Sequence, residues 1–251
     1  MKIELIKKEF EEYIKKYNTK DEKIKLKYEH SYRVMELMST LAERLGLTEE
    51  EKCIAELIGL LHDIGRFEQI KKYDTFNDNI SIDHADRGAN YLIKEGNIRK
   101  YIAETKYDEI IDKAIRNHNK KEIDKNIKDE KELLFTKMIR DCDKIDIFKT
   151  NSMEDTMIFD KKEITEEVLK DYYNEKIIDL KKIETKADSI IVTLAFIFDF
   201  NYKEGYRLLE ESKNFELYRD GIIVKKGSEK LWKEIIKIHE NRLNENIYKA
   251  N

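Results

Sequence analysis

Leu60-Leu61-His62-Asp63-Ile64-Gly65-Arg66 ends an apolar segment and places an imidazole directly beside a carboxylate. Buried polar groups are costly unless they are paired or bind a metal ion. The rest of the chain offers partners for this doublet, because four of its five histidines lie between positions 30 and 118. These four are His30, His62, His84 and His118. Each lies at or near the end of a segment with helical periodicity, and Asp143 lies on the next one.

The composition excludes several classes of protein. Of the 251 residues, 40% are hydrophobic and 41% are charged. The hydrophobic fraction is well above that of a disordered chain. The net charge is only −4 and the two signs are interleaved, so nothing demands a nucleic-acid polymer or an anionic membrane as partner. Residues 1–8 lack the apolar run of a signal peptide, and the apolar stretch 189–198 is too short to span a bilayer. We therefore expect a cytoplasmic protein.

The apolar residues recur with helical spacing along almost the whole chain, so the sequence predicts an all-α fold. Helices are expected over residues 28–45, 48–63, 83–95, 107–118 and 129–149, and in the C-terminal part over 163–183, 187–211 and 228–248. Thr48 and Glu51 form a capping-box pattern at the start of the second helix, and Gly65 suits its stop. Asp220-Gly221 favours a tight turn or a small hairpin over residues 218–224.

Two domains are expected. Residues 20–155 hold the clustered histidines and would form a helical catalytic core, whereas residues 156–251 carry no comparable cluster and would form a C-terminal helical extension packed on that core. His239 lies on an apolar stripe of the extension without a partner motif, so it is expected to be structural. Cys53 and Cys142 lie on apolar faces and are expected to be buried thiols.

The clustered residue types indicate a metal centre. Divalent transition metals accept mixed imidazole and carboxylate ligands, and sites that activate water keep positions open for solvent and substrate. Ligands collected from the ends of several helices are typical of sites built inside a helical bundle.

The order and local setting of these residues resemble the HD-domain metal-dependent phosphohydrolase superfamily over about residues 25–150. The resemblance rests on His30, on His62-Asp63 within the letters His-Asp-Ile-Gly, and on residues 140–146, Arg-Asp-Cys-Asp-Lys-Ile-Asp. In that family His, His-Asp and Asp bind one metal, which implies His30, His62, Asp63 and Asp143 as ligands here. Asp141 and Asp146 compete with Asp143 for the last position; Asp143 best matches the family's Asp-(Lys/Arg)-hydrophobic-Asp string.

Two-metal members of the superfamily add two histidines between the doublet and the final aspartate. His84 and His118 occupy that interval, so the resemblance implies a second site made of Asp63, His84 and His118, with Asp63 bridging two ions. The implied cofactors are two divalent transition-metal ions: Mn, Fe, Zn, Ni or Co.

Cationic side chains near the ligands are candidates for contact with a phosphate. Arg66 lies one turn past His62, Arg87 follows His84 by three residues, and Lys144 is next to Asp143. Lysines in the flanking loops are further options: Lys71, Lys72, Lys120 and Lys121.

The chain departs from the superfamily's cyclic-dinucleotide phosphodiesterases of the HD-GYP type. Those usually have a lysine after the doublet, a His-His pair and a Gly-Tyr-Pro motif. Here Arg66 stands in the first position, Asn119 follows His118, and the sequence contains no proline. The substrate of that group cannot be transferred to this chain.

The sequence therefore predicts a metal-dependent phosphohydrolase that cleaves a phosphomonoester or phosphodiester, with a nucleotide as the favoured small substrate. Metal-activated water would attack phosphorus, with Asp63 and Arg66 as catalytic residues. Two alternatives stay open. Some HD-fold proteins use a mixed-valent di-iron pair for oxygenation, and the same six ligands would serve. A non-catalytic module that senses a nucleotide is the other.

Overall fold

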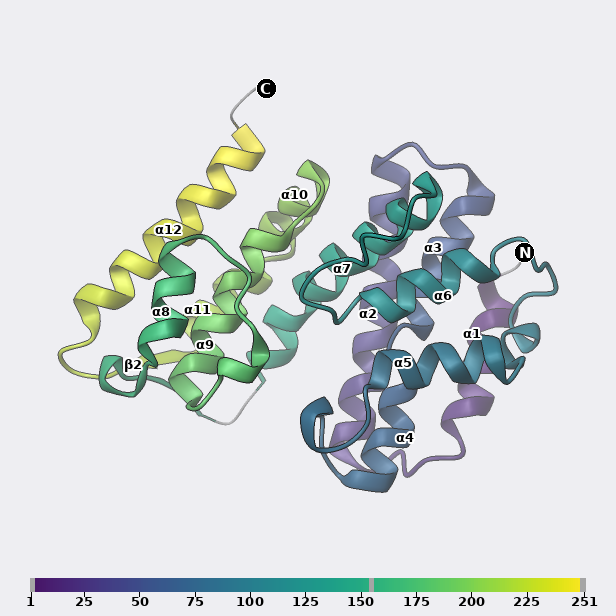
Figure 1. The fold of residues 1–251 in the computed structure, drawn as a ribbon, viewed down its shortest axis with the longest axis horizontal. Coiled ribbons are helices and arrows are strands. Elements are labelled where there is room, and N and C mark those ends of the chain that lie inside the picture. Colours follow the sequence, from purple (N-terminus) through teal and green to yellow (C-terminus); the bar gives the residue numbers. More distant parts are fainter. Residues whose placement is uncertain (1–2, 154–155, 249–251) are drawn as a thin grey trace. The chain divides into compact units, whose positions relative to one another are not determined.

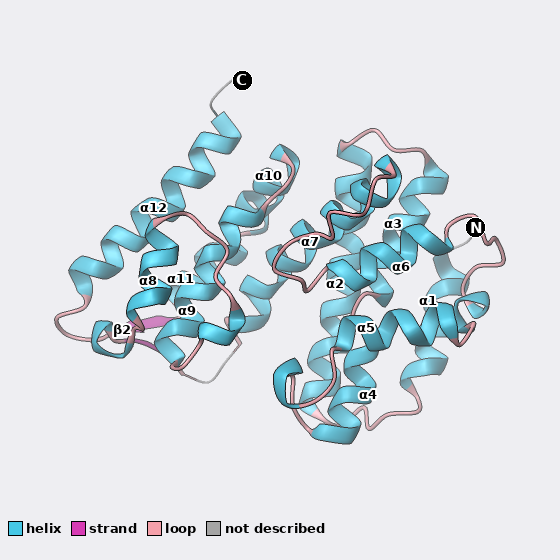
Figure 2. Ribbon diagram, viewed as in Figure 1, coloured by secondary structure: helices cyan, strands magenta, loops and turns pink. Residues whose placement is uncertain are grey.

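The computed structural model describes residues 3–153 and 156–248 and divides the chain into two compact units, residues 1–143 and 144–251. Both are built from helices, as Figures 1 and 2 show, and the predicted all-α class is confirmed. Among the described residues, none of the helices is long and apolar enough to cross a membrane.

The first unit consists of helices joined by polar loops. Its α-helices are α1 (Ile3–Ile14), α2 (Glu22–Arg44), α3 (Glu49–Leu61), α4 (Ile64–Tyr73), α5 (His84–Ala89), α6 (Asp108–Asn117) and the first part of α7 (Glu130–Asn151). Short 3-10 turns lie at η1 (Asp78–Ile80) and η3 (Asn97–Lys100), and α5 continues into a π-helical turn, η2 (Asn90–Lys94). The predicted stripe of α2 is buried: Val34, Met38 and Leu41 are fully inaccessible.

Helix α3 begins as its sequence predicts. The Thr48 hydroxyl accepts a hydrogen bond from the backbone N–H of Glu51, and the Glu51 carboxylate accepts one from the N–H of Thr48. This capping box satisfies backbone donors that a helix start leaves without partners. The helix ends at Leu61, so His62 caps its C-terminus and Asp63 lies at the junction with α4.

The expected role of Gly65 as a helix stop is wrong, because Gly65 lies in the first turn of α4. The residue is small because α4 and α5 approach closely at this point. A Cβ atom at Gly65 would lie 2.2 Å from the carbonyl oxygen of His84 and 2.8 Å from the backbone nitrogen of Gly88. Backbone atoms cannot move aside as a flexible side chain can, so the contact sets the position of His84.

The second unit contains the end of α7 and further helices around one short parallel strand pair. The helices are α8 (Glu166–Tyr173), α9 (Lys186–Ala195), α10 (Lys203–Ser212), α11 (Asn214–Asp220) and α12 (Glu229–Tyr248), with 3-10 turns at η4 (Lys161–Glu163), η5 (Leu180–Lys182) and η6 (Phe196–Asp199). The strands are β1 (Met157–Phe159) and β2 (Ile222–Val224).

Three predictions for this unit are wrong. The helix expected over 163–183 ends at Tyr173, and the helix expected over 187–211 is interrupted between Ala195 and Lys203. Of the two alternatives for residues 218–224, the hairpin is wrong: residues 214–220 form α11, a turn at Gly221 follows, and β2 pairs with β1, which lies more than 60 residues away in the sequence. Strand pairing between distant segments leaves no local signal, whereas Asp-Gly does favour local hairpins.

Both cysteines are free, as expected; Cys142 is buried, whereas Cys53 is only half-buried. His239 lies inside the second unit, stacked on Phe215 with ring centroids 3.8 Å apart and edge-on to Phe148. This burial lowers the pKa of His239 to about 3. The side chain is therefore neutral at pH 7, and its surroundings are consistent with the structural role expected for it.

We predict that His239 makes the second unit acid-sensitive. Its pKa in the folded state is below the unfolded value, so its contribution to stability is full above about pH 6.5 and is lost as the pH falls towards 3. Replacing it by leucine should therefore reduce the loss of unfolding free energy between pH 7 and pH 5 by about 2 kcal/mol. Denaturant titration followed by fluorescence of Trp232, the single tryptophan, reports on this unit. An equal loss in both proteins would contradict the prediction.

We also predict that Gly65→Ala destabilises the first unit more than Gly88→Ala does. A Cβ at Gly88 meets its nearest atoms at 3.2 Å, a gap that small shifts can open, whereas at Gly65 it meets a carbonyl oxygen at 2.2 Å. Forced overpacking of this kind costs about 1–3 kcal/mol or more. Circular-dichroism melting of both variants is the measurement, and similar melting temperatures would show that α4 and α5 separate easily.

Candidate metal centre

Six buried side chains that the sequence singled out come together in the first unit. His30 projects from the middle of α2, His62 and Asp63 lie between α3 and α4, and Asp143 lies on α7. His84 is the first residue of α5, and His118 follows the last residue of α6. None of the six is more than 7% exposed. Helix ends supply four of the six residues, whereas His30 and Asp143 come from helix interiors; the expectation that His30 lies at or near a helix end is wrong, because α2 begins at Glu22.

One oxygen of Asp63 faces a first group of ligands. Nε2 of His30 lies 3.2 Å from Nε2 of His62 and 3.1 Å from Oδ1 of Asp143. Oδ2 of Asp63 lies 3.5 Å and 3.6 Å from the same two nitrogens. We call these atoms of His30, His62, Asp63 and Asp143 the first half of the centre.

The other oxygen of Asp63 faces a second group. Nε2 of His84 and Nε2 of His118 are 3.0 Å apart. Oδ1 of Asp63 lies 3.2 Å from the first and 3.6 Å from the second. We call these atoms the second half. Asp63 thus presents one oxygen to each half, which is the arrangement that a bridging carboxylate requires.

The hydrogen bonds of the imidazoles test whether a cation fits. Nδ1–H of His62 donates to the carbonyl oxygen of Gly59 at 2.8 Å, and that of His118 donates to Ile115 at 2.7 Å. A carbonyl can only accept, so Nε2 of each neutral ring carries a lone pair. Nδ1–H of His84 is likewise directed at a carboxylate oxygen of Asp78, at 2.6 Å. Lone pairs of His84 and His118 that face each other at 3.0 Å repel unless a cation lies between them.

The separations between ligand atoms agree with such a cation. Metal–nitrogen bonds of about 2.1 Å place neighbouring ligand atoms about 3.0 Å apart in an octahedral shell and about 3.4 Å apart in a tetrahedral one. Three groups drawn from these six residues have all their ligand atoms within 4.8 Å of one another. The donor set therefore fits divalent metal ions.

The pKa shifts give the two carboxylates and His118 the protonation states that metal binding needs, whereas His62 differs: burial would lower its pKa, but Asp63 and Asp143 raise it, so a metal ion would have to displace a proton from this ring. Burial alone would raise the pKa of Asp63, but the charges of Lys27 and His62 hold it well below its usual value. The pKa of Asp143 is also well below its usual value, because hydrogen bonds from His30 and His62 outweigh burial. Burial lowers the pKa of His118 to about 4. Ionised carboxylates and neutral imidazoles are the forms that coordinate metals.

The two other candidates for the last aspartate lie elsewhere. Asp141 is fully buried but belongs to none of the candidate metal-binding groups among the described residues, and the same holds for Asp146. Asp146 accepts a hydrogen bond from the hydroxyl of Thr150 on its own helix. The geometry therefore favours Asp143.

The three predicted substrate-binding residues do not lie together. Arg66 borders the centre, with Nε 3.7 Å from Oδ1 of Asp63, and its other contacts are with Asp78 at 2.9 Å and the carbonyl oxygen of Phe76 at 2.6 Å. Arg87 instead pairs with Glu68 and Glu95. Lys144 pairs with Asp199 at 2.5 Å in the second unit. Geometry supports only Arg66 of the three as a residue at the centre.

Of the four lysines expected in the flanking loops, Lys71 and Lys72 lie in α4 instead, and contacts are seen for these two and for Lys120. Lys72 pairs with Glu68, Lys120 pairs with Asp83, and Lys71 lies over the ring of Tyr17. These contacts hold them at the surface of helices α4 and α5.

Sequence reasoning missed three residues that touch the ligands. Lys27 places Nζ 2.7 Å from Oδ2 of Asp63, Asp78 holds the ring of His84, and Arg140 binds the backbone around His118. Lys27 lies one turn before His30 on α2, a spacing that could have identified it. Asp78 lies in a loop, where no periodicity points to it.

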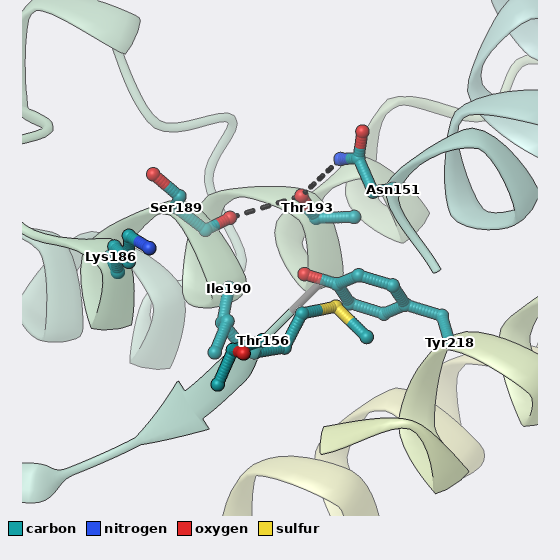
Figure 3. Close-up of a pocket in the computed structure, with 8 residues that line it drawn as sticks. Asn151, Thr156, Lys186, Ser189, Ile190, Thr193 and Tyr218 are labelled. Carbon is teal, nitrogen blue, oxygen red and sulfur yellow. Dashed lines mark hydrogen bonds between the residues drawn. The ribbon is translucent and has the colours of Figure 1, made fainter. Parts of the chain in front are cut away.

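A separate cavity of about 70 Å³ lies in the second unit (Figure 3). The hydroxyl of Thr193 links two of its walls, accepting from the Asn151 amide at 3.0 Å and donating to the carbonyl oxygen of Ser189 at 3.0 Å. Pockets for small-molecule substrates usually enclose about 300 Å³ or more. This cavity holds none of the predicted site residues and is too small for a nucleotide.

In a comparison with protein families, residues 28–148, which include most of the first unit, match the model of the HD domain. The match includes all six clustered residues. Comparisons with curated proteins and with solved structures give no match. The family resemblance expected from the sequence is confirmed for this segment.

We predict that Asp143→Asn lowers the metal content of the purified protein, whereas Asp146→Asn leaves it unchanged. Asp143 supplies an oxygen 3.1 Å from the His30 nitrogen, and loss of its charge removes an anionic ligand from the first half. Inductively coupled plasma mass spectrometry after reconstitution with Mn²⁺ is the measurement. Loss of metal in Asp146→Asn alone would reassign the ligand.

Proposed function

Because residues 28–148 are an HD domain, a helical fold that binds divalent metals and is common among metal-dependent phosphohydrolases, we propose that this protein hydrolyses a phosphate ester. One observation carries the proposal. The two oxygens of Asp63 face two separate ligand groups, and two-metal centres of this kind clamp a phosphoryl group during displacement. The proposed ligands are the six clustered residues, with two divalent transition-metal ions as cofactors.

When bound, such ions polarise phosphoryl oxygens and make water a nucleophile at neutral pH. Asp63 and Asp143 supply only two negative charges to the centre, so two divalent ions would leave it positive. Lys27 and Arg66 add further positive charge, each at a different oxygen of Asp63. A cationic and largely buried centre favours an anionic substrate, since charges interact more strongly away from water.

Lys27 and Arg66 are the residues that we propose to bind non-bridging phosphoryl oxygens. Both lie beside the ring of Phe76, with Nζ of Lys27 5.6 Å and Cζ of Arg66 5.8 Å from its centroid. The aromatic contact restricts both cations to the same region. Arg66 offers a planar fork that suits phosphate, and Lys27 offers a point charge.

Nucleotides are the first substrates to test, because they combine phosphate with a flat ring that can lie against an aromatic side chain such as Phe76. Phosphomonoesters and phosphodiesters both fit the proposed chemistry. Lys27 and Arg66 support binding of a phosphate group, a property that hydrolysis and nucleotide sensing share, so turnover is what separates these two functions.

We predict that the protein loaded with Mn²⁺ hydrolyses members of a panel of phosphomonoesters, phosphodiesters and nucleotides without oxygen. Asp63→Ala should lower the rate at least about 100-fold, because both halves lose their shared ligand. Product release is followed by phosphate detection and chromatography. Turnover that requires iron and oxygen would favour the oxygenase instead. Tight nucleotide binding without turnover would favour the sensing module.

We further predict that Lys27→Met lowers kcat about 100-fold, the usual cost of removing one electrostatic contact to a transition state. Lys25→Met is the matched control, because Lys25 lies on the same helix but is 68% exposed and faces Glu29. Steady-state kinetics on the best substrate of the panel is the measurement. Equal kinetics in the two variants would remove Lys27 from the proposed mechanism.

A further inference from the structure

The two halves of the centre are held by different kinds of structure. In the first half, His30 and Asp143 project from the interiors of long helices. In the second half, His84 follows the loop 74–83 and His118 precedes the loop 119–129. Ligands next to loops need other groups to fix them, because loops are less restrained than helix interiors.

Asp78 fixes the ring of His84. Its Oδ2 atom accepts from Nδ1–H of His84 at 2.6 Å, so Nε2 is directed at Asp63. Its Oδ1 atom accepts from Arg66 at 2.9 Å and from the amide of Gln69 at 2.8 Å. Both donors belong to α4, so the loop carboxylate is fastened to a helix. A carboxylate behind a ligating imidazole sets the ring's orientation and raises its basicity.

Arg140 fixes the backbone that carries His118. This side chain is 1% exposed, and its guanidinium donates to the carbonyl oxygens of Asn117 at 2.8 Å and Lys120 at 2.5 Å. A third contact, from the other terminal nitrogen, reaches the carbonyl oxygen of Lys121 at 3.3 Å. The last carbonyls of a helix lack partners inside the helix, and a cation there is favourable. Arg140 therefore closes the end of α6 on both sides of His118.

We propose that Asp78 and Arg140 are positioning residues that set the affinity of the second half for its ion independently of the first half. The inference rests on the proposed two-metal centre and goes beyond it, because it makes the two ions bind unequally. Both residues act on the side of the centre that holds His84 and His118: Asp78 contacts the ring of His84, and Arg140 contacts the carbonyl oxygens that flank His118. Partners of this kind contribute about 10–100-fold to metal affinity.

The test is calorimetric titration of the full-length protein with Mn²⁺, combined with metal analysis at each plateau. Asp78→Asn keeps the shape of the side chain and removes its charge, and Arg140→Lys keeps the charge and removes the fork. Each should weaken one of the two binding events about 10–100-fold and leave the other unchanged. Asp78→Glu, which retains a carboxylate, should recover part of the loss.

Matched controls come from α5 and α6, the helices next to His84 and His118. Asp86 on α5 faces Arg116 and Lys120, and Arg116 on α6 faces Asp112. The control variants are Asp86→Asn and Arg116→Lys. Both should bind two ions as the wild type does. Thermal melting of each variant separates affinity from folding, since a structural role alone would lower the melting temperature and weaken both events together.

The outcomes are distinct. A lower affinity for one ion, with the affinity for the other unchanged, supports the inference. Two ions that bind with unchanged affinity in Asp78→Asn and Arg140→Lys, or that weaken in parallel, overturn it and leave the proposed hydrolysis standing. A wild-type protein that binds a single ion also overturns it, whereas one that binds none overturns the proposed function as well.

Discussion

The first unit depends on one electrostatic constraint: nitrogen lone pairs and carboxylate oxygens are directed at one another inside an apolar interior. His84 and His118 face each other at 3.0 Å, and Asp63 lies between them and the other two histidines. Bringing such atoms together without a cation costs free energy, because each repels its neighbour and none is hydrated. Lys27 and Arg66 offset part of this repulsion. The remainder is best offset by metal ions, and the helices hold the donors where those ions would bind.

The arrangement of helices follows from this constraint. The capping box at Thr48 fixes the start of α3, and the end of that helix delivers His62 and Asp63 to the centre of the unit. The close approach at Gly65 then brings α5 against α4, so that His84 lies on the other side of Asp63. Apolar burial stabilises these helices. The polar residues His62, Asp63, His84 and His118 show where four of the helix ends meet.

The sequence predicted the ligands better than their surroundings. Apolar periodicity identified α2, α3, α6 and α7, and family order identified the six residues that the structure brings together. The roles of charged residues were harder to predict, because any lysine or arginine near a clustered residue in the sequence is a candidate for contact with the substrate. Arg87 and Lys144 pair with carboxylates elsewhere, whereas Lys27 was missed although it contacts Asp63. The β1–β2 pair joins distant segments, and neither strand is long enough to show alternation.

Helix α7 carries both Asp143 and Arg140, three residues apart and therefore about 4.5 Å along the axis on neighbouring faces. One rigid rod thus holds a ligand of the first half and the clamp on the loop of the second half. A translation or rotation of this rod would misalign the two halves in concert. Helix α7 is therefore a single rigid element, and strain in it would displace residues of both halves at once.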